Sequence, residues 1–166
     1  MATLNMDTIK VKIADLAVLR ESGVIITVGL GSCVGIGLYD ESSRVGGLAH
    51  ILLSESLQFQ NRSGMLNKAK FADTAIPILI GEMEKIGGKR TRLQAKIAGG
   101  SQLFSSNKSG ISVGEKNIDA VRRALEQLNI PIVGEDLGGS HGRTMRLYVD
   151  SGRVTISTVG KGVIVL

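Results

Sequence analysis

Apolar and polar residues alternate in the first third of the chain in a way that is typical of β-strands. Between residues 8 and 19, Ile9, Val11 and Ile13 lie on one side of the pattern with lysines between them, as in a half-buried strand. The run that follows is uncharged and rich in β-branched residues, which is typical of a buried strand. Turn residues separate it from two further apolar runs. Strands are therefore expected at residues 8–19, 24–28, 33–39 and 45–53.

A helical spacing of apolar residues follows further along the chain. Over residues 69–86 they recur every three or four positions, which predicts an amphipathic helix. Pro77 inside this pattern leaves two alternatives: the helix kinks there, or it begins near Asp73 with the proline in its first turn. The glycines at 87–88 are expected to end this helix. The same spacing predicts a second helix over residues 113–128.

The predicted elements together indicate an α+β fold. Further strands are expected at residues 92–97, 132–135, 145–149 and 154–159. About eight strands and two helices, with most strands adjacent in sequence, favour a fold in which antiparallel pairing dominates. Both helices can cover one face of a sheet, and its other face then needs a second sheet or water. No repeat or linker interrupts the pattern, so residues 1–166 are expected to form one domain.

Composition narrows the classes of function. A single cysteine excludes an internal disulfide framework and fits a reducing cytoplasm. No apolar stretch approaches the roughly 18–20 residues of a membrane span, so a cytoplasmic protein without membrane insertion is expected. The net charge of +5 comes from lysines and arginines scattered among acidic residues, and few aromatics are present to stack on bases. Nucleic acid is therefore not expected as a partner, whereas an acidic protein surface is.

The one cysteine of the chain stands at the end of a predicted strand. Cys33 closes the run T-V-G-L-G-S-C that begins at Thr27, and His50 lies on a later predicted strand. Strand, turn and strand can bring the thiol and the imidazole together, as a nucleophile and its base require. The alternative is that Cys33 only packs in the core, because an unpaired cysteine is among the residue types most often buried.

The residues around Cys33 favour a catalytic role for this cysteine over a purely structural one. The glycines beside the cysteine allow backbone N–H groups to converge near the sulfur, which makes Gly31 and Ser32 candidates for an oxyanion hole. His50 lies on an apolar strand and needs a polar partner there, which the Thr27 hydroxyl can supply. A neighbouring imidazole is expected to lower the pKa of the Cys33 thiol.

Other kinds of site find less support. The G-L-G run at residues 29–31 is not a dinucleotide fingerprint, because Val34 stands where a third glycine belongs and no helix pattern follows. One cysteine and two separated histidines do not make a structural zinc site, and neither metal nor cofactor is expected. No G-x-S-x-G motif supports a serine nucleophile. His141, in a glycine-rich loop, remains the alternative base to His50.

Seven runs of residues follow one another along the chain in a recognisable order. They are G-L-G-S-C-V-G-I-G-L-Y-D, G-G-L-A-H-I-L-L, K-F-A-D-T-A-I-P-I-L-I-G-E-M, A-K-I-A-G-G, N-I-D-A-V-R-R-A-L, I-V-G-E-D-L-G-G and G-R-T. In these runs the chain resembles the CheD family, the chemoreceptor glutamine deamidases of bacterial chemotaxis. The resemblance covers nearly the whole chain in order and includes the spacing between Cys33 and His50. One departure is Ser54, where the family often has proline.

The resemblance implies a fold, a reaction and partners. It implies a three-layer β-β-α sandwich, with Cys33 as the nucleophile on a receptor glutamine, His50 as base and then acid, and Thr27 as the residue that orients His50. No cofactor or metal is implied. The implied partners are the helical cytoplasmic domains of chemoreceptors and the chemotaxis phosphatase CheC. The loops at residues 54–67 and 101–110 are the expected docking surfaces, with Phe104 as the candidate anchor.

Overall fold

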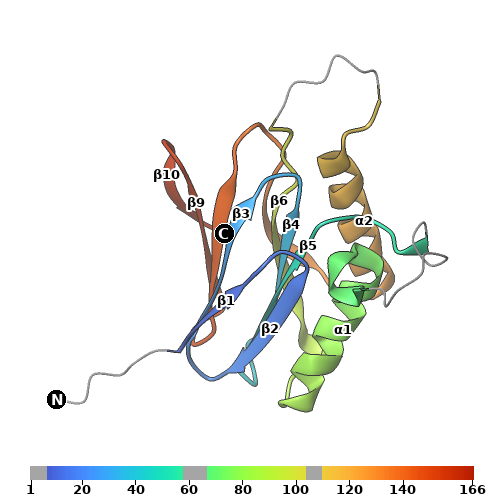
Figure 1. The fold of residues 1–166 in the computed structure, drawn as a ribbon. Coiled ribbons are helices and arrows are strands. Elements are labelled where there is room, and N and C mark those ends of the chain that lie inside the picture. The colour runs from blue at the N-terminus through green and yellow to red at the C-terminus, as the bar shows by residue number, and fades with distance from the viewer. Residues whose placement is uncertain (1–6, 58–66, 104–109) are drawn as a thin grey trace.

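A computed structural model describes residues 7–57, 67–103 and 110–166 and shows two five-stranded sheets and a pair of helices (Figure 1). The outer sheet has the strand order β1 (Thr8–Val11), β3 (Val24–Leu30), β8 (Arg143–Tyr148), β9 (Arg153–Thr158) and β10 (Gly162–Val165). The central sheet has the order β2 (Asp15–Arg20), β5 (Val45–Ile51), β4 (Val34–Asp40), β6 (Gln94–Gly99) and β7 (Ile132–Leu137). The helices, α1 (Ala72–Lys85) and α2 (Val113–Gln127), cover the far side of the central sheet (Figure 1).

Side-chain alternation divides the central sheet between two cores. On β4, Ile36 and Leu38 face the helices, whereas Gly35 and Gly37 face the outer sheet. All seven residues of β5 are buried, because this strand has a packed layer on each side. The side chains between the two sheets form what we call the inter-sheet layer. Polar groups placed there are shielded from water, so each needs a hydrogen-bond partner within the layer.

Helix α1 packs an apolar stripe on the central sheet. Buried residues on this stripe include Ala75, Leu79 and Met83. The helix begins at Ala72, close to the predicted start near Asp73, but Pro77 is its sixth residue and does not lie in the first turn. No helix in the described parts of the chain is long and apolar enough to cross a membrane.

Helix α2 begins with a capping box. The Ser112 hydroxyl accepts a hydrogen bond from the Glu115 N–H, and the Glu115 carboxylate accepts one from the Ser112 N–H. Its buried residues include Val121 and Leu125, which pack on the same core as α1. Both predicted helices are thus present and lie on one side of the sheets.

The predicted fold class is confirmed, with two corrections to its strands. The three layers follow the order β-β-α, and among the strands in the described ranges the pairs β1–β3 and β6–β7 are parallel and the other pairs antiparallel. The single strand predicted over residues 8–19 is wrong. It is two strands, β1 in the outer sheet and β2 in the central sheet, because Ala14 adopts a φ of 61° that turns the chain between them. The final strand, β10, was not predicted.

A partly buried ion pair links the end of β4 to the segment before β6. Asp40 is fully buried and accepts hydrogen bonds from the Arg92 guanidinium at 2.8 Å and from the Lys89 backbone N–H at 2.9 Å. Burial alone would raise the pKa of Asp40, but these hydrogen bonds outweigh it and hold the pKa well below its usual range. The ionised carboxylate therefore stabilises the fold.

Asp40→Asn is expected to lower the free energy of unfolding at neutral pH by about 1–2 kcal/mol, since the amide cannot replace a carboxylate that accepts charged hydrogen bonds. The loss stays modest because the Arg92 side chain is 35% exposed. Asp40 has a lower pKa folded than unfolded, so its contribution is complete above the unfolded value of about 3.9 and disappears as the pH falls through the folded value.

Urea unfolding of both proteins at about pH 7 and about pH 3 measures this difference. The exposed neighbour Glu41 supplies the control, because Glu41→Gln should leave stability nearly unchanged at both values. If Asp40→Asn and the unaltered protein differed in free energy of unfolding by as much at about pH 3 as at about pH 7, this would contradict the claim that the ionised Asp40 carboxylate stabilises the fold.

Candidate active site around Cys33 and His50

The register of β4 and β5 makes Cys33 and His50 neighbours. Gly35 on β4 pairs with His50 on β5, and Cys33, two residues before Gly35, lies on the same face of the sheet. The two residues are therefore diagonal neighbours across an antiparallel pair. The Cα atoms of such neighbours lie about 7–8 Å apart, and their Cβ atoms lie somewhat closer. Both face the inter-sheet layer, where Cys33 is 5% exposed and His50 is fully buried.

A hydrogen bond to Thr27 in the outer sheet determines which nitrogen of the His50 ring carries the hydrogen. Thr27 Oγ1 lies 2.6 Å from His50 Nδ1 and donates its own proton to the Val11 carbonyl at 2.7 Å. A hydroxyl has one proton, so Thr27 must accept from the ring, and Nδ1 carries the hydrogen. Nε2 is then the unprotonated nitrogen. It is buried and has no hydrogen-bond partner among the described residues.

Burial keeps the thiol and the imidazole uncharged. It lowers the pKa of His50 to about 4, because the imidazolium form loses its hydration. It raises the pKa of the Cys33 thiol, and a hydrogen bond from the Cys33 backbone N–H only partly opposes this. The expectation that the pKa of Cys33 is lowered is therefore wrong for the resting site. A neutral thiol beside a neutral base must lose its proton as it attacks.

Three consecutive carbonyl groups fix the turn that leads into Cys33. Each is bound by a donor from a distant segment: Gly31 O by the Ser101 N–H and hydroxyl, both at 2.8 Å, Ser32 O by Asn117 Nδ2 at 2.8 Å, and Cys33 O by the Gly100 N–H at 2.7 Å. Gly99 permits this approach, because its φ is +111° and a Cβ there would overlap the Cys33 carbonyl oxygen. The turn is thus held by donors from the segment after β6 and from α2.

The N–H groups of the same turn differ in availability. The Gly31 N–H donates to the Gly29 carbonyl at 3.0 Å, so this predicted oxyanion donor is already engaged. The Ser32 N–H has no backbone acceptor among the described residues outside the strand ladders. The Cys33 N–H, which was not among the predicted donors, has no backbone acceptor among the described residues outside the strand ladders either, and it lowers the pKa of its own thiol. The structure therefore favours Ser32 and Cys33 as the donors of an oxyanion hole.

The remaining predicted residues lie elsewhere. His141 is exposed, and its ring contacts the Ser140 hydroxyl at 3.3 Å, so the geometry favours His50 as the base. Phe104, the candidate anchor, lies outside the described residues. No group of three or more His, Cys, Asp or Glu side chains suited to a metal ion occurs in the described ranges.

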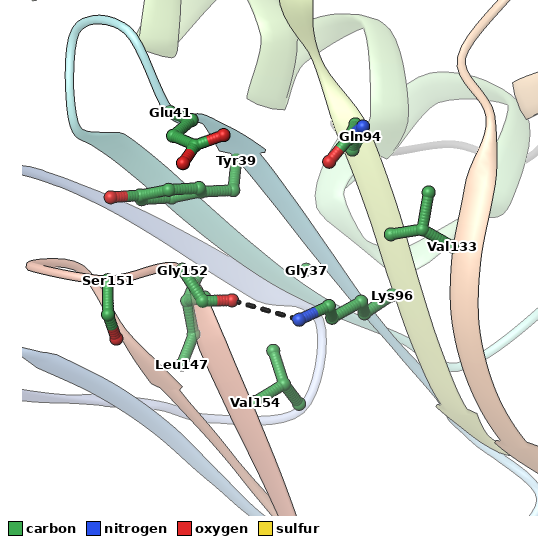
Figure 2. A pocket seen from close by; sticks show the side chains of 10 residues that line it. All are labelled: Gly37, Tyr39, Glu41, Gln94, Lys96, Val133, Leu147, Ser151, Gly152 and Val154. Atoms are coloured by element: carbon green, nitrogen blue, oxygen red, sulfur yellow. Dashed lines mark hydrogen bonds between the residues drawn. The ribbon is translucent and has the colours of Figure 1, made fainter. Parts of the chain in front are cut away.

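A hollow of about 130 Å³ lies at the opposite end of the inter-sheet layer (Figure 2). Lys96 crosses it from β6 and donates to the Gly152 carbonyl at 3.2 Å, while the Tyr39 ring and Val154 form part of its walls (Figure 2). Burial lowers the pKa of Lys96. None of the predicted site residues lines this hollow, and Lys96 acts there as a polar link between the two sheets.

Sequence reasoning missed Asn117, although a signal was present. Asn117 occupies the apolar stripe of α2, one turn before Val121, and is fully buried. A polar residue on an apolar stripe requires a partner. The same reasoning identified His50 on its strand and would have identified Asn117.

Comparison with known proteins relates this chain to one group. The family model CheD, described as CheD chemotactic sensory transduction, matches residues 52–158. A protein of Moorella thermoacetica named probable chemoreceptor glutamine deamidase CheD is 50% identical over 163 residues, which cover 96% of each chain. Proteins of the same name from Clostridium novyi and Clostridium botulinum are each 49% identical, over 96% of this chain and 98% of theirs. Alignments of this extent include the segment from Thr27 to His50.

The neutral state of the site makes a prediction about alkylation. The rate at which iodoacetamide modifies Cys33 should rise with pH and inflect above about 8.5, the ordinary value for a free cysteine, because only the thiolate reacts. His50→Ala should leave this inflection at or above the ordinary value. The unfolded protein in urea serves as the control. A plateau already reached near neutral pH, and lost in His50→Ala, would instead show a thiolate–imidazolium pair.

Proposed function

The chain belongs to the CheD family, and from this membership we propose that it is a chemoreceptor glutamine deamidase. Such an enzyme is a hydrolase that converts glutamine side chains of chemoreceptors to glutamate and releases ammonia. The observation that carries the proposal is the hydrogen bond from His50 Nδ1 to Thr27, which leaves Nε2 as a free base in the same layer as the one thiol. A thiol and a base on adjacent strands suit attack on a carboxamide.

In the proposed reaction the Cys33 sulfur attacks the side-chain carbonyl carbon of a glutamine as its proton passes to His50 Nε2. The C–S bond forms, and the carbonyl oxygen becomes an oxyanion that the Ser32 and Cys33 N–H groups stabilise. The Nε2 proton then moves to the leaving nitrogen, the C–N bond breaks, and ammonia departs from a thioester. Water attacks the thioester, giving its proton to Nε2. The thiolate leaves, recovers that proton, and glutamate is released.

Thr27 contributes by orientation in this mechanism. Its hydroxyl accepts from Nδ1, and the hydroxyl is itself held by the Val11 carbonyl on β1. The ring therefore presents Nε2 throughout, whether it is neutral or transiently protonated. A neutral ring also suits both halves of the reaction, because it can accept a proton and return it at neutral pH.

We propose that the substrates are the cytoplasmic helical domains of chemoreceptors, so that the enzyme works in the cytoplasm. The site stands at the end of β4 and not in the hollow of Figure 2, which suits a side chain offered by a large partner. The net charge of +5 supports attraction to an acidic protein surface.

We also propose that the chain binds the phosphatase CheC, as its resemblance to the family implies. Support comes from Leu103 and Ile111, which are 47% and 60% exposed at the two ends of the segment that contains Phe104. Exposed apolar side chains of this kind are common at protein contacts. The alternative is that regulation of CheC is the main function of the chain. The variant Cys33→Ala distinguishes this alternative from catalysis.

Cys33→Ala is expected to reduce conversion of receptor glutamines to glutamate by roughly 10³-fold or more, because the variant lacks the one thiol of the chain. Receptor cytoplasmic fragments are incubated with each protein, and the modified peptides are counted by mass spectrometry. Undiminished conversion by the variant would contradict the thiol mechanism. If the variant binds CheC and still supports chemotaxis in cells, the regulatory function is the main one. If it binds CheC and chemotaxis fails, catalysis is required.

A further inference from the structure

Asn117 joins both strands of the proposed site to helix α2. Its side chain is fully buried, and Nδ2 donates to the Ser32 carbonyl at 2.8 Å and to the Leu52 carbonyl at 3.0 Å. Ser32 immediately precedes Cys33, and Leu52 immediately follows β5, the strand of His50. One amide group therefore binds the backbone on either side of the thiol and the imidazole.

The orientation of this amide is determined by its partners. Both are carbonyl oxygens, which only accept hydrogen bonds, so the NH₂ group of Asn117 must face them. Its Oδ1 is consequently turned away, and this buried oxygen has no hydrogen-bond partner among the described residues. A buried acceptor without a partner destabilises the fold. The side chain thus keeps its two donor contacts although its oxygen is left unsatisfied.

Peptide geometry connects Asn117 to the reacting atoms. In a planar trans peptide the C=O and the N–H point in opposite directions. Because Asn117 holds the Ser32 carbonyl, the N–H of Cys33 in the same peptide points away from α2. That N–H belongs to the same residue as the attacking sulfur. An oxyanion formed on a carbon that the sulfur attacks lies within reach of this donor.

We propose that Asn117 is a positioning residue, which aims the Cys33 N–H at the oxyanion by fixing the plane of the Ser32–Cys33 peptide. The proposal rests on the proposed deamidase function. Ser101 acts on the preceding peptide in the same way, since it holds the Gly31 carbonyl through its N–H and hydroxyl, both at 2.8 Å. The orientations of two successive peptide groups before the thiol are thus fixed by Ser101 and Asn117.

Two reactions of the same thiol separate this role from general support of the fold. Deamidation passes through an oxyanion, whereas alkylation by iodoacetamide displaces iodide at a saturated carbon and forms none. Loss of an oxyanion donor lowers kcat by about 10²–10³-fold in enzymes of this kind. A side chain that only supports the fold would alter both rates together or neither.

The test compares Asn117→Leu, which keeps the size of the side chain and removes its donors, with Asn117→Ala. Asp119→Ala, at an exposed position on the same helix, is the matched control. For each protein we would measure kcat and KM for a receptor fragment, the alkylation rate of Cys33 and the thermal unfolding transition. The ratio of kcat to the alkylation rate should fall about 10²-fold in the Asn117 variants, with KM little changed, and stay constant in the control.

The other outcomes overturn the proposal. An unchanged kcat in the folded Asn117 variants would show that the amide does not position a catalytic group. Equal losses of deamidation and alkylation, or loss of the folded state in both variants, would show that Asn117 supports only the fold. If the unaltered protein alkylates normally but deamidates no receptor fragment, the proposed function fails instead.

Discussion

The site depends on one hydrogen bond between two sheets. Thr27 on β3 accepts from His50 on β5, and it can only accept because its single proton is committed to the Val11 carbonyl. The side chains packed around this contact in the inter-sheet layer are mostly apolar. It determines which ring nitrogen is free, and burial determines that the ring is neutral. The packing of the sandwich therefore sets the chemistry of the histidine.

The proposed catalytic groups lie where three segments converge on the end of β4. The central sheet supplies Cys33 and His50, the outer sheet supplies Thr27, and α2 supplies Asn117. The carbonyl groups of Gly31, Ser32 and Cys33 are bound by donors from the segment after β6 and from α2, which fixes the orientation of their peptide groups. A donor array built in this way needs no charged residue beside the sulfur, in agreement with the raised pKa of Cys33.

Much of this arrangement could be predicted from local patterns. Alternation located most strands, and a histidine on an apolar strand indicated its need for Thr27. The break at Ala14 could not be predicted, because alternation continues through it while the backbone turns at a φ of 61°. The pKa direction of Cys33 was also missed, since burial of the thiol arises only when the two sheets pack together. Asn117 was overlooked because the helix was interpreted from its apolar residues alone.

Nitrogen NMR of the His50 ring tests the central claim most directly. At about pH 7 we expect a single neutral tautomer with hydrogen on Nδ1 and an unprotonated Nε2, because the pKa of His50 is about 4. In Thr27→Val, which keeps the shape of the side chain but cannot accept a hydrogen bond, this preference should be lost. Hydrogen on Nε2, or a doubly protonated ring at neutral pH in the unaltered protein, would contradict the account.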